Sequence, residues 1–382
     1  MPRRFAPSGL ALLLSVTLAA ARADEAPPGA SAPATADATQ VESRLPPLHP
    51  RAGRARPIVA VVGQNAGTEL VDFVVPYGIL AESGVADVIA LATEEGPLRM
   101  RPALRLQAQA TIAGFDADHP DGADIVIVPA VTDERTHDAA LLAWLRGQSD
   151  KGATVVSICD GALVVANAGL FDGHRATGHW ATRAQRAREH AAVRWVDNVR
   201  YVGDGRVVSS AGVSAAIPAS IALVEAIGGT PAAMALAKRL GAGDWSARHD
   251  SARFGIDAGT VLTYAGNRWF SSHHDVVLPV ADGVDEIALA LVADTWARTL
   301  RGRVSTRFTG ETPPSTVHTL RGLVLLPEEA PRADDASART IAVPSDAPPL
   351  DSLDRSLQAI ESAYGASTAR FVALQIEYPA TF

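Results

Sequence analysis

The sequence predicts a doubly wound α/β fold, in which helices cover both faces of a mostly parallel sheet. Short apolar runs recur from residue 58 onward, and segments with apolar residues at helical spacing separate them. Aromatic residues make up only 5% of the chain, while Ala, Val, Leu and Gly are abundant, which suits close packing of helices on a sheet. The mixture of 47% apolar and 20% charged residues is that of a globular protein with a buried core.

The predicted elements alternate between strands and helices. The strands cover residues 58–62, 85–91, 124–128 and 154–158. Helical spacing is shown in the segment 69–82 by Leu70, Phe73, Val74, Tyr77 and Leu80, and in a later helix by Leu141, Leu142 and Leu145. This alternation implies parallel strands joined by crossover helices. Active sites of such sheets lie at the carboxyl ends of the strands.

The first 23 residues have the features of a secretory signal peptide. Arg3 and Arg4 precede an apolar stretch over residues 10–20, and Ala21-Arg22-Ala23 offers the small-x-small pattern that a signal peptidase reads. The apolar stretch is short for a transmembrane helix, so we expect cleavage, with an uncleaved membrane anchor as the alternative. The protein is therefore expected to be exported, periplasmic or extracellular, and to touch a membrane only through an uncleaved leader.

An Ala/Pro-rich segment over residues 24–56 follows the leader and is predicted to be a flexible linker. Removal of the leader, which holds three arginines and no acid, changes the formal net charge from −8 to −11. A chain this acidic lacks the basic face that a nucleic-acid partner requires. The expected partner is a small-molecule substrate or ligand.

Cys159 is the single cysteine of the chain, so the fold contains no internal disulfide. It directly follows the predicted strand 154–158, and a predicted helix that ends at Gly169 starts at once after it. A nucleophile on so sharp a turn projects from the sheet, and the small Gly161 lets the backbone make the turn. The start of the helix favours a thiolate and a developing oxyanion. The alternative is a small buried hydrophobic residue, which is the usual role of a free cysteine.

Two further candidates follow from the predicted topology. His179 lies twenty residues after Cys159, and histidine is the usual basic partner of a nucleophilic thiol. Asp72 and Glu69 share one face of the first helix, which starts at the end of the first strand, so either carboxylate can reach the turn. A structural histidine and a solvated helix face are the alternatives.

Four blocks of sequence form a recognisable pattern: CDGA at 159–162, NAGLFDG at 167–173, RATGHW at 175–180 and SSAGVSA at 209–215. They resemble the ThiJ/PfpI family of the class I glutamine-amidotransferase-like superfamily, in particular the branch with isonitrile hydratases and sensor domains of some AraC-type regulators. The resemblance covers about residues 57–240 and implies a flavodoxin-like sheet with Cys159 as nucleophile. It places His179 at the family's histidine position and Asp72 at the acid that, when protonated, hydrogen-bonds the thiolate. It also makes a homodimer an expected form, because many relatives are dimers.

Two positions depart from the family pattern. Ala130-Val131 replaces a Gly-Gly pair that helps to form an oxyanion hole in many relatives, which leaves open whether the Val131 amide serves beside the Asp160 amide. Asp160 replaces a threonine of the isonitrile-hydratase-like members. A carboxylate at this place opposes thiolate formation unless it is turned away, pairs with a base or is protonated. A role of Asp160 as general acid or base is the alternative.

The C-terminal third shows weak similarity to the first part of the chain. Residues 285–300 are similar to 69–82, residues 317–327 to 98–112, and residues 357–374 to 221–237. We interpret residues 285–382 as a truncated, degenerate second copy without the nucleophile block, with an unrelated α+β appendage as the alternative. A strand over 301–308 and an exposed loop over 327–349 are predicted inside it, and residues 241–284 are predicted to be a linker region.

No cofactor and no metal are expected. The chain has no Gly-rich phosphate loop, and the adjacent His273 and His274 lack a spaced third ligand. Two classes of function remain. The first is a hydrolase or lyase in which Cys159 attacks small carbonyl, amide or nitrile-like compounds. The second is a non-enzymatic thiol redox or small-ligand sensor without a DNA-binding part.

Overall fold

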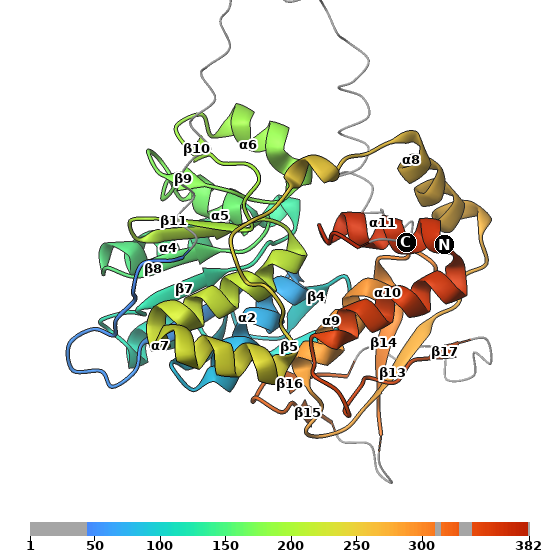
Figure 1. Cartoon of the computed structure of the whole chain (residues 1–382). Helices are drawn as coiled ribbons and strands as arrows, with labels where there is room; N and C mark the ends of the chain where they lie inside the picture. The colour runs from blue at the N-terminus through green and yellow to red at the C-terminus, as the bar shows by residue number, and fades with distance from the viewer. Residues whose placement is uncertain (1–43, 310–314, 328–337, 381–382) are drawn as a thin grey trace, which may run out of the picture. The chain divides into compact units, whose positions relative to one another are not determined.

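The computed structural model describes residues 44–309, 315–327 and 338–380 (Figure 1). The predicted leader and the first part of the predicted linker lie outside the described residues. The described residues all belong to one compact unit by their internal contacts.

A seven-stranded sheet with the order β11-β12-β8-β7-β1-β3-β6 forms the centre of the N-terminal part (Figure 1). Its strands are β1 (Ile58–Gly63), β3 (Asp87–Ala92), β6 (Ala110–Thr111), β7 (Ile125–Val128), β8 (Thr154–Ser157), β11 (Tyr201–Asp204) and β12 (Val207–Ser210). All neighbours are parallel except β11, which pairs antiparallel with β12 at the edge. The strands β3, β1, β7, β8 and β12 have the flavodoxin-like order 2-1-3-4-5. The predicted fold class is confirmed.

Helices cover both faces of this sheet, because side chains along each strand point alternately to opposite faces. On one face, Val59 and Val61 of β1 belong to a core shared with α2 (Leu70–Ser83) and α7 (Ala216–Leu240). On the other face, Ala60 and Val62 pack in a core with α3 (Ile112–Asp118), α4 (Ala139–Asp150) and α5 (Gly161–Asn167). Burial on both faces explains why the strands read as continuous apolar runs.

The helical segment Val213–Leu240 is the one stretch of the described chain that is long and apolar enough to cross a membrane. It contains α7, which packs against α2 and is kinked at Gly229, where φ is 82°. More than half of its most apolar window, 56%, is buried inside the fold. A core helix of a soluble domain meets the same criteria, so the segment is weak evidence for a membrane span.

Residues 44–56 differ from the predicted flexible linker. Leu45 is buried, and the Leu48 amide donates a hydrogen bond to the carbonyl of Ala226 in α7 (2.9 Å). Arg51 and Arg54 both pair with the buried Asp124, with 2.6 Å between Arg54 Nη1 and the carboxylate. Two isolated leucines and two arginines therefore anchor the segment, although they form no periodic pattern in the sequence.

The C-terminal part contains a second, three-stranded parallel sheet with the order β14-β13-β17. Its strands are β13 (Val276–Val280), β14 (Val304–Phe308) and β17 (Arg339–Thr340), and its helices are α9 (Glu286–Ala297), α10 (Asp351–Tyr364) and α11 (Ala366–Gln375). The strand predicted over 301–308 is present as β14. The loop predicted over 327–349 contains β17, and its residues 328–337 lie outside the described chain.

The linker region predicted over residues 241–284 is wrong in part. It contains helix α8 (Ala258–Ala265), the π-helical turn η5 (Gly266–Phe270) and the central strand β13. Pro279 interrupts the apolar run of β13 and hid the strand from pattern analysis. The carbonyl of Asp275 accepts from the Arg339 amide of β17, and the carbonyl of Val277 accepts from Ile341, which follows β17. Pro279, two positions further along, therefore turns its missing N–H to the side where β17 has ended.

Two hairpins join the parts. They consist of β4 (Leu98–Arg101) with β5 (Arg105–Gln107), and β15 (Val317–His318) with β16 (Val324–Leu325). Strands β5 and β16 pair antiparallel, which gives one mixed sheet β15-β16-β5-β4-β2, where β2 is Thr68–Glu69. Residues 317–327, which are similar in sequence to residues 98–112, therefore contain a hairpin that pairs with the hairpin of that earlier region.

Candidate functional site

Cys159 lies on a sharp turn between β8 and α5, at the carboxyl edge of the central sheet. Its φ angle of 56° is in the left-handed region, which is strained for a residue with a side chain. The Gly161 amide closes the turn by donating to the carbonyl of Ile158 (2.9 Å). A Cβ on Gly161 would lie 2.0 Å from the carbonyl oxygen of Val128, so only glycine fits there. The Gly161 amide is thus used by the turn itself.

Cys159 is only 5% exposed, and its thiol lies among acidic groups. Burial raises the pKa of Cys159 well above its usual range, and the charges of Asp72, Asp160 and Glu69 raise this pKa further. A hydrogen bond from the Asp160 amide opposes the shift. The resting site therefore disfavours the thiolate, in contrast to the expectation from the start of the helix, because desolvation of the buried thiol and its acidic surroundings oppose ionisation more than a helix of only seven residues favours it.

Asp72, on the first turn of α2, is fully buried next to this turn. Burial raises the pKa of Asp72 to about 8, partly opposed by the hydrogen bond that the Ala130 amide donates to Oδ2 (3.1 Å). Its other oxygen, Oδ1, has no hydrogen-bond partner in the described part of the chain. At neutral pH Asp72 is thus a carboxylic acid, and it titrates as part of a coupled group with its neighbours.

Glu69, the alternative acid, is held by a different partner. Its Oε1 accepts from Nη2 of Arg298 at 2.5 Å, and Nε of Arg298 also contacts Oδ2 of Asp294 at 2.7 Å. Arg298 follows α9 and thus comes from the C-terminal part. Arg298 and Asp294 were not predicted as site residues, because nothing in the local sequence connects them with an acid more than 220 residues away.

The carboxylate of Asp160 pairs with a basic side chain, that of Arg186. Pairing with a base was one of the arrangements that the sequence analysis left open for Asp160. Thr182 donates its hydroxyl to Oδ1 of Asp160 (2.5 Å), and the buried guanidinium of Arg186 lies 3.7 Å from the same oxygen. Arg186 also donates to Thr182 and to the carbonyls of His179 (2.5 Å) and Gly178 (3.2 Å). Thr182 and Arg186 were not predicted as site residues. Their place just after the RATGHW block is the one feature of the sequence that could have indicated a role in the site.

His179 is placed differently from a simple base for the thiol. Its Nε2 lies 3.1 Å from the carbonyl of Gln375, and its Nδ1 accepts from the Ala181 amide at 3.3 Å. These partners assign the neutral form with the proton on Nε2. Both ring nitrogens are therefore engaged, and the ring joins the RATGHW block to the end of α11.

Glu377 completes this connection to the C-terminal segment. Its buried carboxylate accepts from the amides of Gly212 (2.7 Å) and Trp180 (3.3 Å), and it lies 2.8 Å from Nε2 of His249. A Cβ on Gly212 would lie 2.5 Å from the carboxylate, so this glycine of the SSAGVSA block is needed for the contact. His249, which had no role in the sequence analysis, lies here.

Val131 is the remaining candidate for an oxyanion donor. Val131 forms an isolated antiparallel β-bridge with Thr68. The two hydrogen bonds of this bridge are made by neighbouring residues: the Glu69 amide donates to the carbonyl of Ala130, and the Thr132 amide donates to the carbonyl of Gly67. This pattern leaves the Val131 amide without an acceptor among the described residues. The Ala130 amide is used by Asp72.

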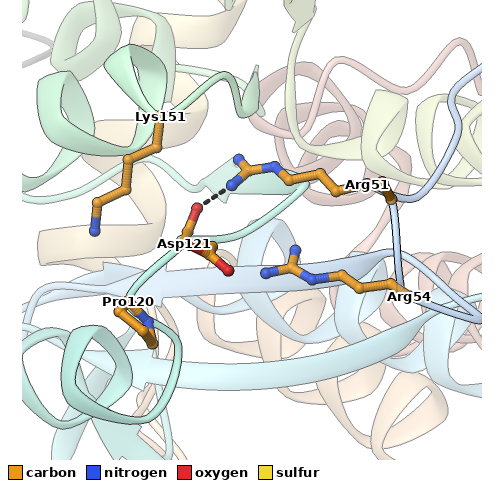
Figure 2. A pocket seen from close by; sticks show the side chains of 6 residues that line it. Arg51, Arg54, Pro120, Asp121 and Lys151 are labelled. Atoms are coloured by element: carbon orange, nitrogen blue, oxygen red, sulfur yellow. Dashed lines mark hydrogen bonds between the residues drawn. The ribbon is translucent and has the colours of Figure 1, made fainter.

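A cavity of about 420 Å³ lies at the opposite edge of the sheet (Figure 2). It is lined by Arg51, Ala52, Arg54, Pro120, Asp121 and Lys151. Asp121 and Lys151 precede β7 and β8, whereas Cys159 follows β8, so the cavity is remote from the thiol. Figure 2 shows Arg51 bonded to Asp121, and the arginines also bind Asp124, so this cavity reflects how residues 44–56 are anchored. Within the described ranges, no group of three or more His, Cys, Asp or Glu side chains is placed to hold a metal ion.

Comparison with known proteins finds a family model that matches part of the chain. Residues 58–226 match the model of the DJ-1/PfpI family. The chain contains a DJ-1/PfpI domain. This domain holds the turn at Cys159, Asp72 and the RATGHW block, which agrees with the resemblance found in the sequence.

Three curated proteins are similar to the chain. Isonitrile hydratase from Pseudomonas putida is 28% identical over 164 residues, which are 42% of this chain and 68% of that protein. Deglycase PfpI from Pyrococcus furiosus is 28% identical over 145 residues, which are 37% of this chain and 82% of that protein. The HTH-type transcriptional regulator CdhR from Pseudomonas aeruginosa is 32% identical over 117 residues, which are 31% of this chain but only 34% of the regulator.

Two solved structures are also similar to the chain. Drosophila melanogaster DJ-1beta has a TM-score of 0.45 and 20% identity, and the match covers 50% of this chain and 100% of that one. A ThiJ/PfpI family protein from Pseudomonas syringae has a TM-score of 0.43 and 21% identity, and the match covers 55% and 81%. The C-terminal part lies beyond the family match, which ends at residue 226.

Proposed function

We propose that this protein is a cysteine-dependent hydrolase or lyase that acts on small carbonyl, amide or nitrile-like compounds. The observation that carries the proposal is the pairing of a strained Cys159 with a buried Asp72 that is protonated at neutral pH and has a free carboxyl oxygen. Such a pair provides a nucleophile and a group that can donate and accept a proton, in one buried site.

The proposed chemistry begins with addition of the thiol to the substrate. Cys159 Sγ forms a bond with the electrophilic carbon, and the electron pair of one C–O or C–N π bond moves to the heteroatom. Asp72 donates its proton to that heteroatom and receives the thiol proton, so the acid is regenerated. The Asp160 amide, and the Val131 amide as second donor, would stabilise the negative charge that develops on the heteroatom. With an amide substrate, the adduct then expels the amine, which leaves with a proton, and a thioester remains; water attacks the thioester carbon, the carboxylic acid is released and the thiol regains its proton.

Two relatives support this class of substrate, since their names describe an isonitrile hydratase and a deglycase. The redox-sensor alternative has less support. Sensor thiols are often next to a resolving cysteine, whereas Cys159 is the single cysteine of the sequence. Export to the periplasm or the extracellular space, inferred from residues 1–23, is part of the proposal.

Turnover of a panel of small aldehydes, amides, nitriles and isonitriles tests the proposal. Wild type should convert at least one class, and Cys159→Ser should be inactive while it keeps the wild-type unfolding temperature. Asp72→Asn should lower kcat by about 10²–10⁴-fold, the usual contribution of a positioned acid or base. Equal activity of the wild type and Cys159→Ser would rule out cysteine catalysis.

A further inference from the structure

The C-terminal sheet repeats the middle of the central sheet. In the C-terminal sheet, β13 lies between the parallel neighbours β14 and β17. In the central sheet, β1 lies between the parallel neighbours β3 and β7. The chain visits both trios in the same sequence, with the central strand first. The central strand is followed by α9 in one trio and by α2 in the other.

The helices that cover the two sheets also correspond. Helix α10 packs against α9 as α7 packs against α2. Helix α7 is broken at Gly229, where φ is 82° and ψ is 167°, and α10 and α11 are joined by Gly365 with φ of 88° and ψ of 160°. The same rare backbone geometry, which only glycine adopts readily, thus breaks the corresponding helix in both parts.

The hairpins agree in register. Val317 at the start of β15 comes 219 residues after Leu98 at the start of β4, and Val324 of β16 comes 219 residues after Arg105 of β5. After β17 the described C-terminal chain goes directly to α10, without a counterpart of β8, the Cys159 turn or α5. The second part therefore resembles the DJ-1/PfpI domain with its nucleophile block removed.

The two parts meet through their corresponding elements. Helix α2 packs against α9, where Ile287 covers the place that a side chain on Gly78 would need, and β5 pairs antiparallel with its counterpart β16. Contacts between like elements are the mark of a two-fold interface, in which the same surface of both subunits is used.

We propose that residues 276–375 are a truncated internal copy of the domain that occupies the place of a second subunit, and that its Arg298 is a positioning residue for the acids beside Cys159. This inference goes beyond the proposed activity, since it concerns how the chain covers its own α2 face and controls the thiol. Its tests therefore use readouts that need no substrate.

Arg298 carries the copy's influence into the site. It pairs with Glu69, the N-cap residue of α2 three residues before Asp72. Burial raises the pKa of both acids, and the positive charge of Arg298 opposes this rise. Its charge also acts on Cys159. Asp294, on α9 of the same copy, holds Nε of Arg298 and so fixes the guanidinium. The copy lacks a nucleophile but supplies a cation to the nucleophile of the other half.

Hydrogen exchange of the full chain at two protein concentrations tests the packing. The amides of α2 and β5 should be protected equally at low and high micromolar concentration, because the cover belongs to the same chain. Protection of these two elements that falls on dilution would mean that a second chain covers them, and would overturn the proposal. Dimers formed through other surfaces do not affect this readout.

The pH dependence of Cys159 alkylation by iodoacetamide tests Arg298. Loss of a nearby positive charge disfavours the thiolate, so Arg298→Gln should lower the alkylation rate at fixed pH about tenfold, whereas Arg298→Lys should stay within about twofold of wild type. The control Arg303→Ala alters an exposed arginine five residues away and should change nothing. Equal rates in wild type, Arg298→Gln and Arg298→Lys would contradict the role of Arg298.

A second variant covers the case in which Arg298→Gln does not fold. Asp294→Asn keeps Arg298 but removes one of its two counter-charges, so the guanidinium should favour the thiolate more strongly. We expect faster alkylation of Cys159 at fixed pH than in wild type. An unchanged rate in a folded Asp294→Asn protein would also contradict the role of Arg298.

Discussion

Gly161 shows how the site depends on single atoms. The turn at Cys159 brings the start of α5 so close to Val128 and Pro129 that no side chain fits at position 161. The thiol position is therefore determined by a backbone contact with the neighbouring strand, and the small residue in the CDGA block is there for steric reasons.

The variant Gly161→Ala should destabilise the protein by about 1–3 kcal/mol, since the backbone must move to relieve the contact with Val128. Chemical denaturation measures the free energy of unfolding. Gly147→Ala in α4 is the matched control: a Cβ there meets no atom within 4 Å, and alanine should stabilise the helix by up to about 1 kcal/mol. Equal effects of the two substitutions would contradict the steric account.

Asp72 should make stability depend on pH. Its pKa is about 8 in the folded protein and about 3.9 in an unfolded chain, so the folded state holds a proton that the unfolded state releases between these values. This contribution to stability is complete below pH 4 and is lost as the pH rises to 8, with a slope of at most about 1.4 kcal/mol per pH unit. Asp72→Asn should flatten the profile and be the more stable protein at pH 8. If the free energy of unfolding depended on pH in the same way in both proteins, the pKa of Asp72 would not be raised in the folded state.

At the residue scale, the sequence predicted Cys159 as nucleophile and Asp72 as its acid, and these roles stay predictions. Cys159 and Asp72 lie together at the edge where parallel strands end, as the topology requires. The ion pairs of Arg298 and Arg186 were beyond prediction, because a guanidinium can pair with any acid that the fold brings near it. The raised pKa of Cys159 also depends on burial, and one sequence does not show how deeply a turn is covered.

At the scale of elements, the end of α11 and the segment that follows it are attached to the DJ-1/PfpI domain by polar contacts. The carbonyls of Leu374 and Gln375 accept from the side chains of Trp180 and His179, and Glu377 binds the Gly212 amide and His249. Four blocks of sequence far apart in the chain meet at this place, which explains why His249 and Trp180 had no evident role in isolation.

The variant Glu377→Ala should cost roughly 2–4 kcal/mol, because it leaves buried amides of Gly212 and Trp180 without an acceptor. Urea denaturation gives the value, and limited proteolysis should show faster cleavage after residue 370. Glu189→Ala, at an exposed glutamate, is the control and should lie within about 0.5 kcal/mol of wild type. A neutral Glu377→Ala would mean that the segment is held by its apolar contacts alone.

Elements with a clear period were predictable, and irregular ones were not. The helix expected over 69–82 is α2, and the one expected within 285–300 is α9, since both have long apolar faces. Strand β13 was missed because a proline inside a strand argues against that strand. Pro279 fits here only because its missing N–H faces the side where β17 has ended, and the sequence does not show this. Residues 44–56 were missed because their anchoring depends on a carboxylate, Asp124, that is distant in sequence.

At the scale of the whole molecule, the chain combines a DJ-1/PfpI domain, a C-terminal part outside the family match and an N-terminal region with the features of a leader. If the C-terminal part is an internal copy, loss of its nucleophile block left a scaffold that covers α2 and adds charge to the site. The two parts would then be only weakly similar in sequence because the C-terminal part had to keep its packing but not a catalytic site.

Expression of the full chain in a bacterium tests export. We expect the mature protein in the periplasmic fraction, beginning at Asp24, because cleavage after Ala21-Arg22-Ala23 follows the signal-peptidase pattern. Mass spectrometry of the fractions gives the answer. An intact amino terminus in the membrane fraction would indicate an anchor, and an intact chain in the cytoplasm would refute export.

The rate of Cys159 alkylation as a function of pH, in wild type and in Asp72→Asn, tests the central claim most directly. The account predicts that the wild-type thiol titrates above its free value of about 8.5, and that Asp72→Asn lowers this pKa because a repelling carboxylate is gone. The variant should therefore react faster with iodoacetamide at pH 8 and yet lose turnover, since it has no acid to relay the proton. An ordinary thiol pKa that Asp72→Asn does not change would contradict the account, because Asp72 would then have no influence on the nucleophile.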